Sequence, residues 1–230
     1  MTKEALLDRY EALGEEPDFL AAKALYEQAL AGEHDARVLA DYGYLLECHA
    51  RLQLRRVVEL YERAIRLDPS YDKPHYQLIS ARAGLQEPEL AIAIYRRRVA
   101  ESPGEAREHR FLASAYLRAH AFEQARKTVD AALKLAPDDA SLLALRGEAR
   151  AGIGDPEGAL ADWKRAVELE PDDIGALYQS AFLLEREGRL AEAIDAWCSI
   201  IDWNDSHDAT LHNEWPKHEL ERLRTANPVN

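Results

Sequence analysis

Side chains that could bind a metal gather in one stretch near the C-terminus, DWNDSHDATLHNE, over residues 202–214. The stretch brings His207 and His212 close in sequence to Asp205 and Asp208, and imidazole and carboxylate groups are zinc ligands in proteins. The spacing of these residues matches no closed zinc site, and the composition is typical of a loop. We therefore predict no metal here, and a metal-binding loop stays the open alternative.

Patterns that carry catalysis are missing from the sequence. The chain has no glycine-rich phosphate loop, no nucleophile elbow, no HExxH and no paired catalytic carboxylates. We expect a protein that is not an enzyme and takes no cofactor. A buried group with a shifted pKa is the alternative that a sequence does not exclude.

The charge balance limits the partners of the chain. Its 230 residues carry a formal net charge of −13, which argues against duplex nucleic acid and against an anionic membrane face. The basic run Arg96-Arg97-Arg98 could bind nucleic acid in principle. We interpret it as solvated charge, with the stem of Arg98 partly buried.

The location that we predict is the cytoplasm. The sequence contains no run of 18 apolar residues that could span a membrane and no apolar signal core near Met1. Cys48 and Cys198 lie far apart and are typical of small buried residues in a reducing compartment.

A spacing of 34 residues recurs through most of the chain. Three series of residues recur at this spacing: one of prolines, one of mostly small residues, and one of mostly large residues four positions after the small ones. Side chains four or seven positions apart lie on one face of a helix. The three series are Pro69, Pro103, Pro137 and Pro171; Val57, Ala91, Ala125, Ala159 and Ala193; and Tyr61, Tyr95, Val129, Trp163 and Trp197.

Each repeat is predicted to contain two helices. The second helix carries the small and large residues and ends near the proline, which cannot continue a helix. Turn-forming residues separate the two helices, as in Gly154-Asp155-Pro156. Because no segment alternates with a period of two, the predicted fold is all-α.

This pattern resembles the tetratricopeptide repeat, a helix–turn–helix unit with a small residue at position 8, Ala at 20, an aromatic residue at 24 and Pro at 32. Gly147, Ala159, Trp163 and Pro171 match it within one repeat. The resemblance implies a right-handed α-solenoid of stacked repeats that forms a single repeat domain over residues 1–230.

The repeats differ in how well they fit the pattern. The segment from residue 3 is divergent, because Tyr10 stands where a small residue belongs, and the next repeat fits only with two residues inserted near its turn. The tail is predicted to form a loop and a capping helix, with Leu220 and Leu223 on one side. The predicted segments are 3–35, 36–71, 72–105, 106–139, 140–173, 174–207 and 208–230.

The resemblance also implies which residues bind a partner, because positions 2, 5, 9, 12 and 13 of each repeat line a concave groove. In repeats 36–71, 72–105 and 106–139 these positions hold five basic residues and one acid, Glu47. The last two repeats hold Glu148, Tyr178, Phe182 and Glu185, among others, at the same positions. The candidate peptide-binding residues are Arg37, Tyr44, Lys73, Tyr76, Ser80, Arg107, Arg110, Ser114 and Arg118.

The distribution of charge agrees with such a groove. Residues 1–35 carry a net charge of −6, residues 36–139 carry +2 and residues 140–230 carry −9. Arginine binds carboxylates through paired hydrogen bonds, and tyrosine adds rigid contact area. We predict a scaffold that binds an extended, acidic segment of another protein. Ordinary solvation of these cations is the alternative interpretation.

Self-association is a second hypothesis. In this case the groove or the irregular first repeat packs against a second copy of the chain, and the protein is a structural homo-oligomer.

Overall fold

The computed structural model describes residues 16–30, 36–172, 174–207 and 209–226, and these ranges contain helices and no strand. The first helix predicted for repeat 3–35, with Tyr10, lies outside the described residues. The helices are α2 (Glu16–Leu30), α3 (Ala36–Leu67), α4 (Asp72–Gly84), α5 (Pro88–Glu101), α6 (Ala106–Arg118), α7 (Phe122–Ala132), α8 (Ala140–Ile153), α9 (Pro156–Leu169), α10 (Gly175–Arg186), α11 (Leu190–Ser206), the 3-10 helix η1 (Thr210–Asn213) and α12 (Glu214–Ala226).

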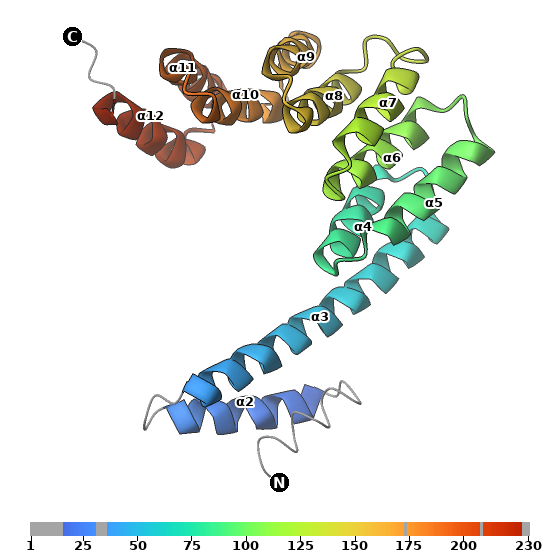
Figure 1. The fold of residues 1–230 in the computed structure, drawn as a ribbon, viewed down its shortest axis with the longest axis vertical. Coiled ribbons are helices and arrows are strands. Elements are labelled where there is room, and N and C mark those ends of the chain that lie inside the picture. Colours follow the sequence, from blue (N-terminus) through green and yellow to red (C-terminus); the bar gives the residue numbers. More distant parts are fainter. Residues whose placement is uncertain (1–15, 31–35, 173, 208, 227–230) are drawn as a thin grey trace. The chain divides into compact units, whose positions relative to one another are not determined.

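The described residues form two compact bodies. The N-terminal body ends at Glu87, and the C-terminal body begins at Pro88. In the C-terminal body the hairpins α6–α7, α8–α9 and α10–α11 follow one another in space (Figure 1), and each falls on one predicted repeat. The all-α solenoid of helix–turn–helix repeats is therefore confirmed. The extent of a single repeat domain over residues 1–230 stays a prediction.

The core of the C-terminal body includes the residues of the small and large series that recur every 34 positions. Each small residue and each large residue of the two series is at most 2% exposed in this body. Within repeat 140–173 the indole of Trp163 lies on Gly147 and donates a hydrogen bond from Nε1 to the Ala144 carbonyl, at 3.0 Å. A Cβ atom at Gly147 would overlap this indole. The small residue at position 8 is thus needed because a large ring from the second helix occupies its place.

The substitution Gly147→Ala tests this packing. We expect a loss of about 1–3 kcal/mol of unfolding free energy, because the buried ring must shift in a dense core. Urea unfolding followed by circular dichroism measures it. Gly104→Ala is the control, since a Cβ atom there meets nothing within 4 Å. Equal stability of the two variants would contradict the packing argument.

The turns between helices depend on residues in the left-handed conformation. Gly154 and Gly188 have φ values of 83° and 73°, and Gln86 and His120 adopt φ values of 60° and 55°. Gly154 ends α8, and the side chain of Asp155 then caps α9 by accepting a hydrogen bond from the Gly158 amide.

The prediction for repeat 36–71 was wrong in one respect. Instead of two helices joined by a turn with inserted residues, α3 runs without interruption for 32 residues. The segment where the turn was expected, Glu47 to Leu54, contains neither Gly nor Pro, and α3 shows no residue with positive φ. Since nothing there favours leaving the helical conformation, the helix continues.

Helix α12 covers the last repeat as predicted. Leu220 and Leu223 are 8% and 2% exposed and pack with Trp197 and Ile200 of α11 in one apolar cluster. This contact fixes α12 on the final hairpin and places its first residues at the end of the body.

Candidate functional site

The first helices α6, α8 and α10 of the C-terminal body form one surface. Neighbouring first helices contact each other directly, and residues at the predicted groove positions meet across them. The charge of Arg118 on α6 acts on Glu148 of α8, and Arg186 of α10 donates from Nη2 to the Ala151 carbonyl of α8, at 3.3 Å. We call this the first-helix surface.

The candidate residues of α6 have different environments on this surface. Arg118 is exposed, and Ser114 is buried, where its Oγ donates to the Arg110 carbonyl at 3.0 Å. Arg110 lies 3.8 Å from Asp139, and Arg107 lies 3.8 Å from Glu108 with its guanidinium over the Phe111 ring. Acidic neighbours therefore already offset part of the charge of Arg107 and Arg110.

The candidates of the N-terminal body are not all brought together. Lys73, Tyr76 and Ser80 lie on α4, and Tyr44 lies on α3 with 48% of its surface exposed. The end of α4 meets α3 at Leu54, and the ten residues from there to Tyr44 span about 15 Å of helix. The side chain of Arg37 lies outside the described residues. A binding role for these residues stays a prediction.

Glu148 has an unusual environment on the first-helix surface. Burial raises the pKa of its carboxyl above the ordinary value, and the nearby charge of Arg118 acts in the opposite direction. Because the native pKa is raised, the contribution of this carboxyl to stability is complete below its unfolded pKa of about 4.3 and is lost as the pH rises through the native pKa.

Removing the positive charge should therefore raise the pKa of Glu148 further. We expect Arg118→Met to shift the titration of the Glu148 carboxyl to higher pH, as measured by NMR, with Glu148→Gln used for assignment. In Glu148→Gln the corresponding loss of stability as the pH rises above about 4 should disappear. An unchanged titration in Arg118→Met would show that the two groups do not interact.

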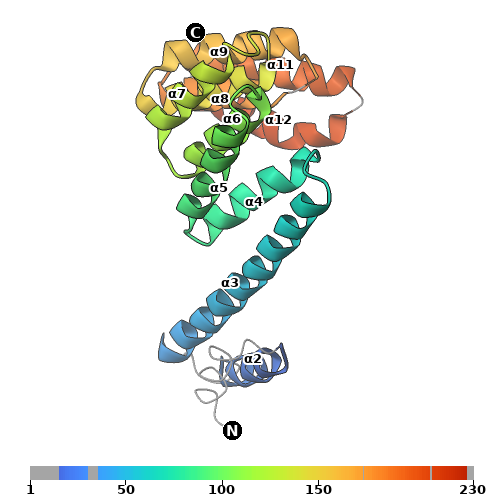
Figure 2. The ribbon, with the colours of Figure 1, turned by 90° about the vertical axis from the view of Figure 1, so that its right-hand side faces the viewer.

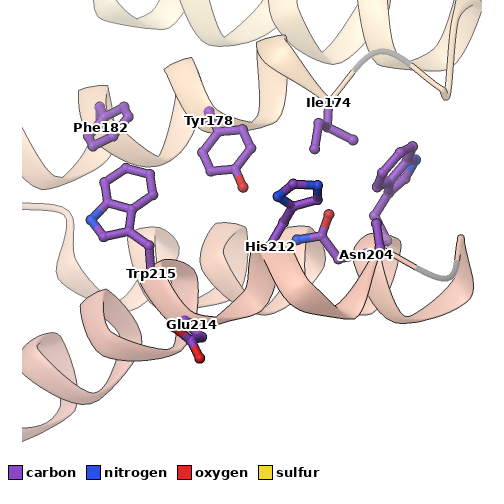
Figure 3. A pocket seen from close by; sticks show the side chains of 9 residues that line it. Ile174, Tyr178, Phe182, Asn204, His212, Glu214 and Trp215 are labelled. Atoms are coloured by element: carbon purple, nitrogen blue, oxygen red, sulfur yellow. The ribbon is translucent and has the colours of Figure 1, made fainter.

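A pocket of about 870 Å³ opens where α10, α11, η1 and α12 meet. Figure 3 shows Ile174, Tyr178 and Phe182 pointing into it from α10 and the turn before it, with His212 and Trp215 on the opposite side. Glu214 also borders the pocket, and its carboxylate points away from these side chains (Figure 3). Phe182 and Trp215 are 43% and 47% exposed. The pocket is thus open to solvent and walled mainly by aromatic rings.

Trp215 holds its position through ring contacts. Its centroid lies 5.3 Å from that of the buried Trp197, 5.5 Å from that of Phe182 and 5.9 Å from that of Tyr178. Edge-to-face and stacked pairs of this kind add to the energy of burial. Trp197 in turn donates from Nε1 to Glu185 of α10 at 2.7 Å. Because these rings belong to α10, α11 and α12, the three helices share one aromatic cluster.

Polar groups fix the other side of the pocket. Asn204 of α11 donates to Asn213 at 2.8 Å, Asn213 donates to Asp205 at 2.6 Å, and both asparagines are 1% exposed. Arg222 of α12 pairs with Glu185 of α10. Buried amides must be hydrogen-bonded, so this network holds η1 in one place.

Side chains of the histidine-containing stretch, residues 202–214, take part in these contacts. His207 stacks on Trp203, with centroids 4.1 Å apart, and its Nδ1 contacts the Trp203 carbonyl at 2.8 Å. His212 borders the pocket, and Asp205 is hydrogen-bonded to Asn213. Asp208 lies outside the described residues. Within the described ranges, no three His, Cys, Asp or Glu side chains gather where they could hold a metal ion.

The basic run on α5 takes part in packing rather than being only solvated. Arg98 donates from Nε and Nη2 to Glu108 at 2.7 and 2.8 Å, and Glu108 is 6% exposed. Arg96 donates to the Tyr116 hydroxyl at 2.7 Å, and Arg97 is exposed. The three side chains thus do not form a single basic patch.

The pocket was not among the predicted sites. Tyr178 and Phe182 stand at groove positions 5 and 9 of one repeat, and two aromatic residues at these positions were the signal that pointed to it. Trp215 gave no such signal, because its contact with them depends on how α12 folds back.

The fold defines a helical-repeat protein, in which the first helices form a surface of their own. Residues 112–177 match a family model described as tetratricopeptide repeat. The predicted resemblance to tetratricopeptide repeat proteins is therefore confirmed.

Solved structures share the fold. A thermophilic TPR protein of Thermus thermophilus has a TM-score of 0.58 and 23% identity, covering 74% of this chain and 94% of that one. MamA of Desulfovibrio magneticus RS-1, from residue 41 to its end, has a TM-score of 0.52 and 20% identity, covering 71% and 92%.

Among curated proteins, Superkiller complex protein 3 of Mus musculus is 26% identical over 206 residues, which is 88% of this chain. The matched part is only 13% of that relative's length. No helix within the described ranges combines the length and the apolar character needed to cross a bilayer.

Proposed function

We propose that the protein is a cytoplasmic, non-catalytic scaffold whose first-helix surface binds an extended segment of a partner protein. The observation that carries the proposal is the pairing of two features on one body. Arginines of α6 lie at one end of the surface, and the open aromatic pocket lies at the other. An extended chain could engage both, because α6, α8 and α10 are neighbours.

The arginines favour an acidic stretch in the partner. Arg118 is exposed, and Arg107 and Arg110 lie near it on α6, 3.8 Å from Glu108 and Asp139. A carboxylate of a partner can bind an exposed guanidinium group such as that of Arg118 through charge-assisted hydrogen bonds. Arg118 also offsets the cost of burying Glu148, so a ligand competes with that carboxyl for it.

The pocket favours an aromatic anchor side chain in the same partner. Exposed rings around a concave site offer stacking and edge-to-face contacts, and buried aromatic anchors dominate the energy of many interfaces. Helices pack about 10 Å apart, so α6 and α10 are separated by about 20 Å, a distance that about six extended residues span.

A fluorescein-labelled probe peptide tests the acidic part. It carries a run of glutamates, six Gly/Ser residues and one tryptophan, and binding is measured by fluorescence anisotropy at low salt. We expect Arg110→Glu/Arg118→Glu to weaken binding about tenfold or more, which corresponds to about 1.4 kcal/mol. A peptide with glutamine in place of glutamate should bind the wild type as weakly as the glutamate peptide binds this double variant.

The matched control reverses two charges on the other side of the hairpin. Lys127→Glu/Lys134→Glu makes the same change in net charge at exposed positions on and just after α7. It should bind the peptide like the wild type. Equal weakening by both double variants would mean that net charge alone, and not the first-helix surface, attracts the peptide.

The aromatic anchor is tested with the same probe. Phe182→Ala should weaken binding about tenfold, because a buried aromatic side chain contributes about 1.5–3 kcal/mol. A probe with alanine in place of tryptophan should no longer distinguish Phe182→Ala from the wild type. Leu135→Ala, at a residue that is 48% exposed outside the pocket, is the control. If the tryptophan and alanine probes bind the wild type equally, the pocket does not hold an anchor.

A further inference from the structure

Helix α3 carries a largely apolar stripe along its length, and the leucines of this stripe are exposed. The stripe residues are spaced alternately by four and three positions, which is the heptad pattern of paired helices. Its leucines at positions 39, 46, 60 and 67 are 51%, 41%, 64% and 79% exposed. The stripe consists of Leu39, Gly43, Leu46, Ala50, Gln53, Val57, Leu60, Ala64 and Leu67.

The two described helices that neighbour α3 in the N-terminal body approach it on other sides. Helix α2 packs on a different side of α3, where Val38 and Leu45 are buried with Tyr26. Helix α4 approaches another side, near Leu54. Figure 2 shows α3 as one rod, with α2 at its N-terminal end and α4 at the other.

The exposure of this stripe follows from the way in which repeat 36–71 folds. Gly43 stands at the small position 8, and Val57 and Tyr61 stand at positions 20 and 24 of repeat 36–71. In the C-terminal body the residues at positions 20 and 24 are at most 2% exposed, and Gly147 at position 8 lies under a ring. In α3, by contrast, Val57 and Tyr61 are half-buried, and a Cβ atom at Gly43 meets nothing within 4 Å.

The two halves of this repeat cannot meet within one straight helix. Gly43 and Tyr61 are 18 residues apart on α3, which is about 27 Å along the axis. Neither half therefore packs on the other within α3. A second copy of the chain carries both halves, so it can satisfy both at once.

We propose that α3 pairs with α3 of a second copy in an antiparallel, two-fold symmetric dimer. With the axis between Ala50 and Gln53, each pair across the interface joins a larger side chain to a smaller one. The four pairs, each made twice, are Leu39 with Ala64, Gly43 with Leu60, Leu46 with Val57 and Ala50 with Gln53.

This register is favoured over a parallel one. A parallel pair places Leu on Leu and Gly43 on Gly43, so large and small layers alternate and leave gaps. The antiparallel register also places a large side chain, Leu60, opposite Gly43 at the small position 8, as the residue at position 24 does in an ordinary repeat. A symmetric contact of this kind closes on itself and yields a dimer rather than a filament.

Charges agree with the antiparallel arrangement. Helix α2, which packs on the first half of α3, has a net charge of −2, whereas residues 53–67 have a net charge of +2. In the dimer these segments of opposite sign lie next to each other. Glu27, which accepts a hydrogen bond from Tyr42 at 3.0 Å, would come beside Arg63 of the second copy.

Sedimentation equilibrium of the full chain tests the dimer. We expect a mass of twice 26.0 kDa at micromolar concentration. Leu46→Lys/Leu60→Lys should weaken dimerisation at least about tenfold with unchanged helicity, because both residues are exposed and lysine is a good helix former. Leu90→Lys/Leu135→Lys, at residues of the C-terminal body that are 48% exposed, should remain dimeric. A wild-type monomer up to about 100 μM overturns the proposal.

Cross-linking tests the register independently. In a chain with Cys48 and Cys198 replaced by serine, Leu39→Cys and Ala64→Cys are made as separate variants. Under mild oxidation a mixture of the two should form a disulfide-linked pair, and Leu39→Cys alone should not. Efficient linkage of Leu39→Cys to itself would establish a parallel pair and overturn the antiparallel arrangement.

Discussion

The close approach of two helices within each repeat is the constraint on which the rest of the structure depends. A large ring from the second helix needs a small residue opposite it, as Trp163 needs Gly147. Where this contact forms, the first helices come together as neighbours and present one surface. The contact also supports the C-terminal pocket, because Trp197, at the same position as Trp163, is the ring against which Trp215 packs.

Helix α3 shows what happens where this contact is not made within the chain. The residues at the matching positions are of the right type, yet α3 has no turn that would let them meet. They are then less buried than their counterparts in the C-terminal body, and they lie along a continuous helix of about 48 Å. The same residues that would close one repeat thus become the surface available to a second molecule.

Ion pairs join helices of the chain and decide which cations are available to a ligand. Asp162 is 4% exposed and binds Arg146 through two bonds and Arg150 through a third, at 2.6 to 2.9 Å. A carboxylate buried in this way is costly unless it is paired. Many arginines of the chain therefore act as internal links, and Arg118 differs from them because it is exposed and acts on Glu148 of the next repeat.

The two proposed contacts reinforce each other if both form. A dimer through the N-terminal body carries two first-helix surfaces, one in each C-terminal body. A partner with two matching segments would then bind the second with a high effective concentration, without any new contact. Weak peptide binding at each surface would be sufficient for such a partner.

The sequence by itself determined the repeat, the helices of the C-terminal body and their core. The period of 34 residues and the series ending in Trp163 and Trp197 are local patterns that recur, so one chain contains several copies of the signal. The covering of the last repeat by Leu220 and Leu223 was also predicted, because the side of a short amphipathic helix can be identified from its spacing.

Only the tertiary structure decided the continuity of α3, the partners of the arginines and the pocket around Trp215. A helix ends where its backbone finds another way to satisfy its hydrogen bonds, and this balance is not set by apolar periodicity. Arg98 and Glu108, or Trp215 and Tyr178, meet through contacts between separate helices. Such contacts depend on how whole helices pack, and no spacing within a single segment of sequence encodes them.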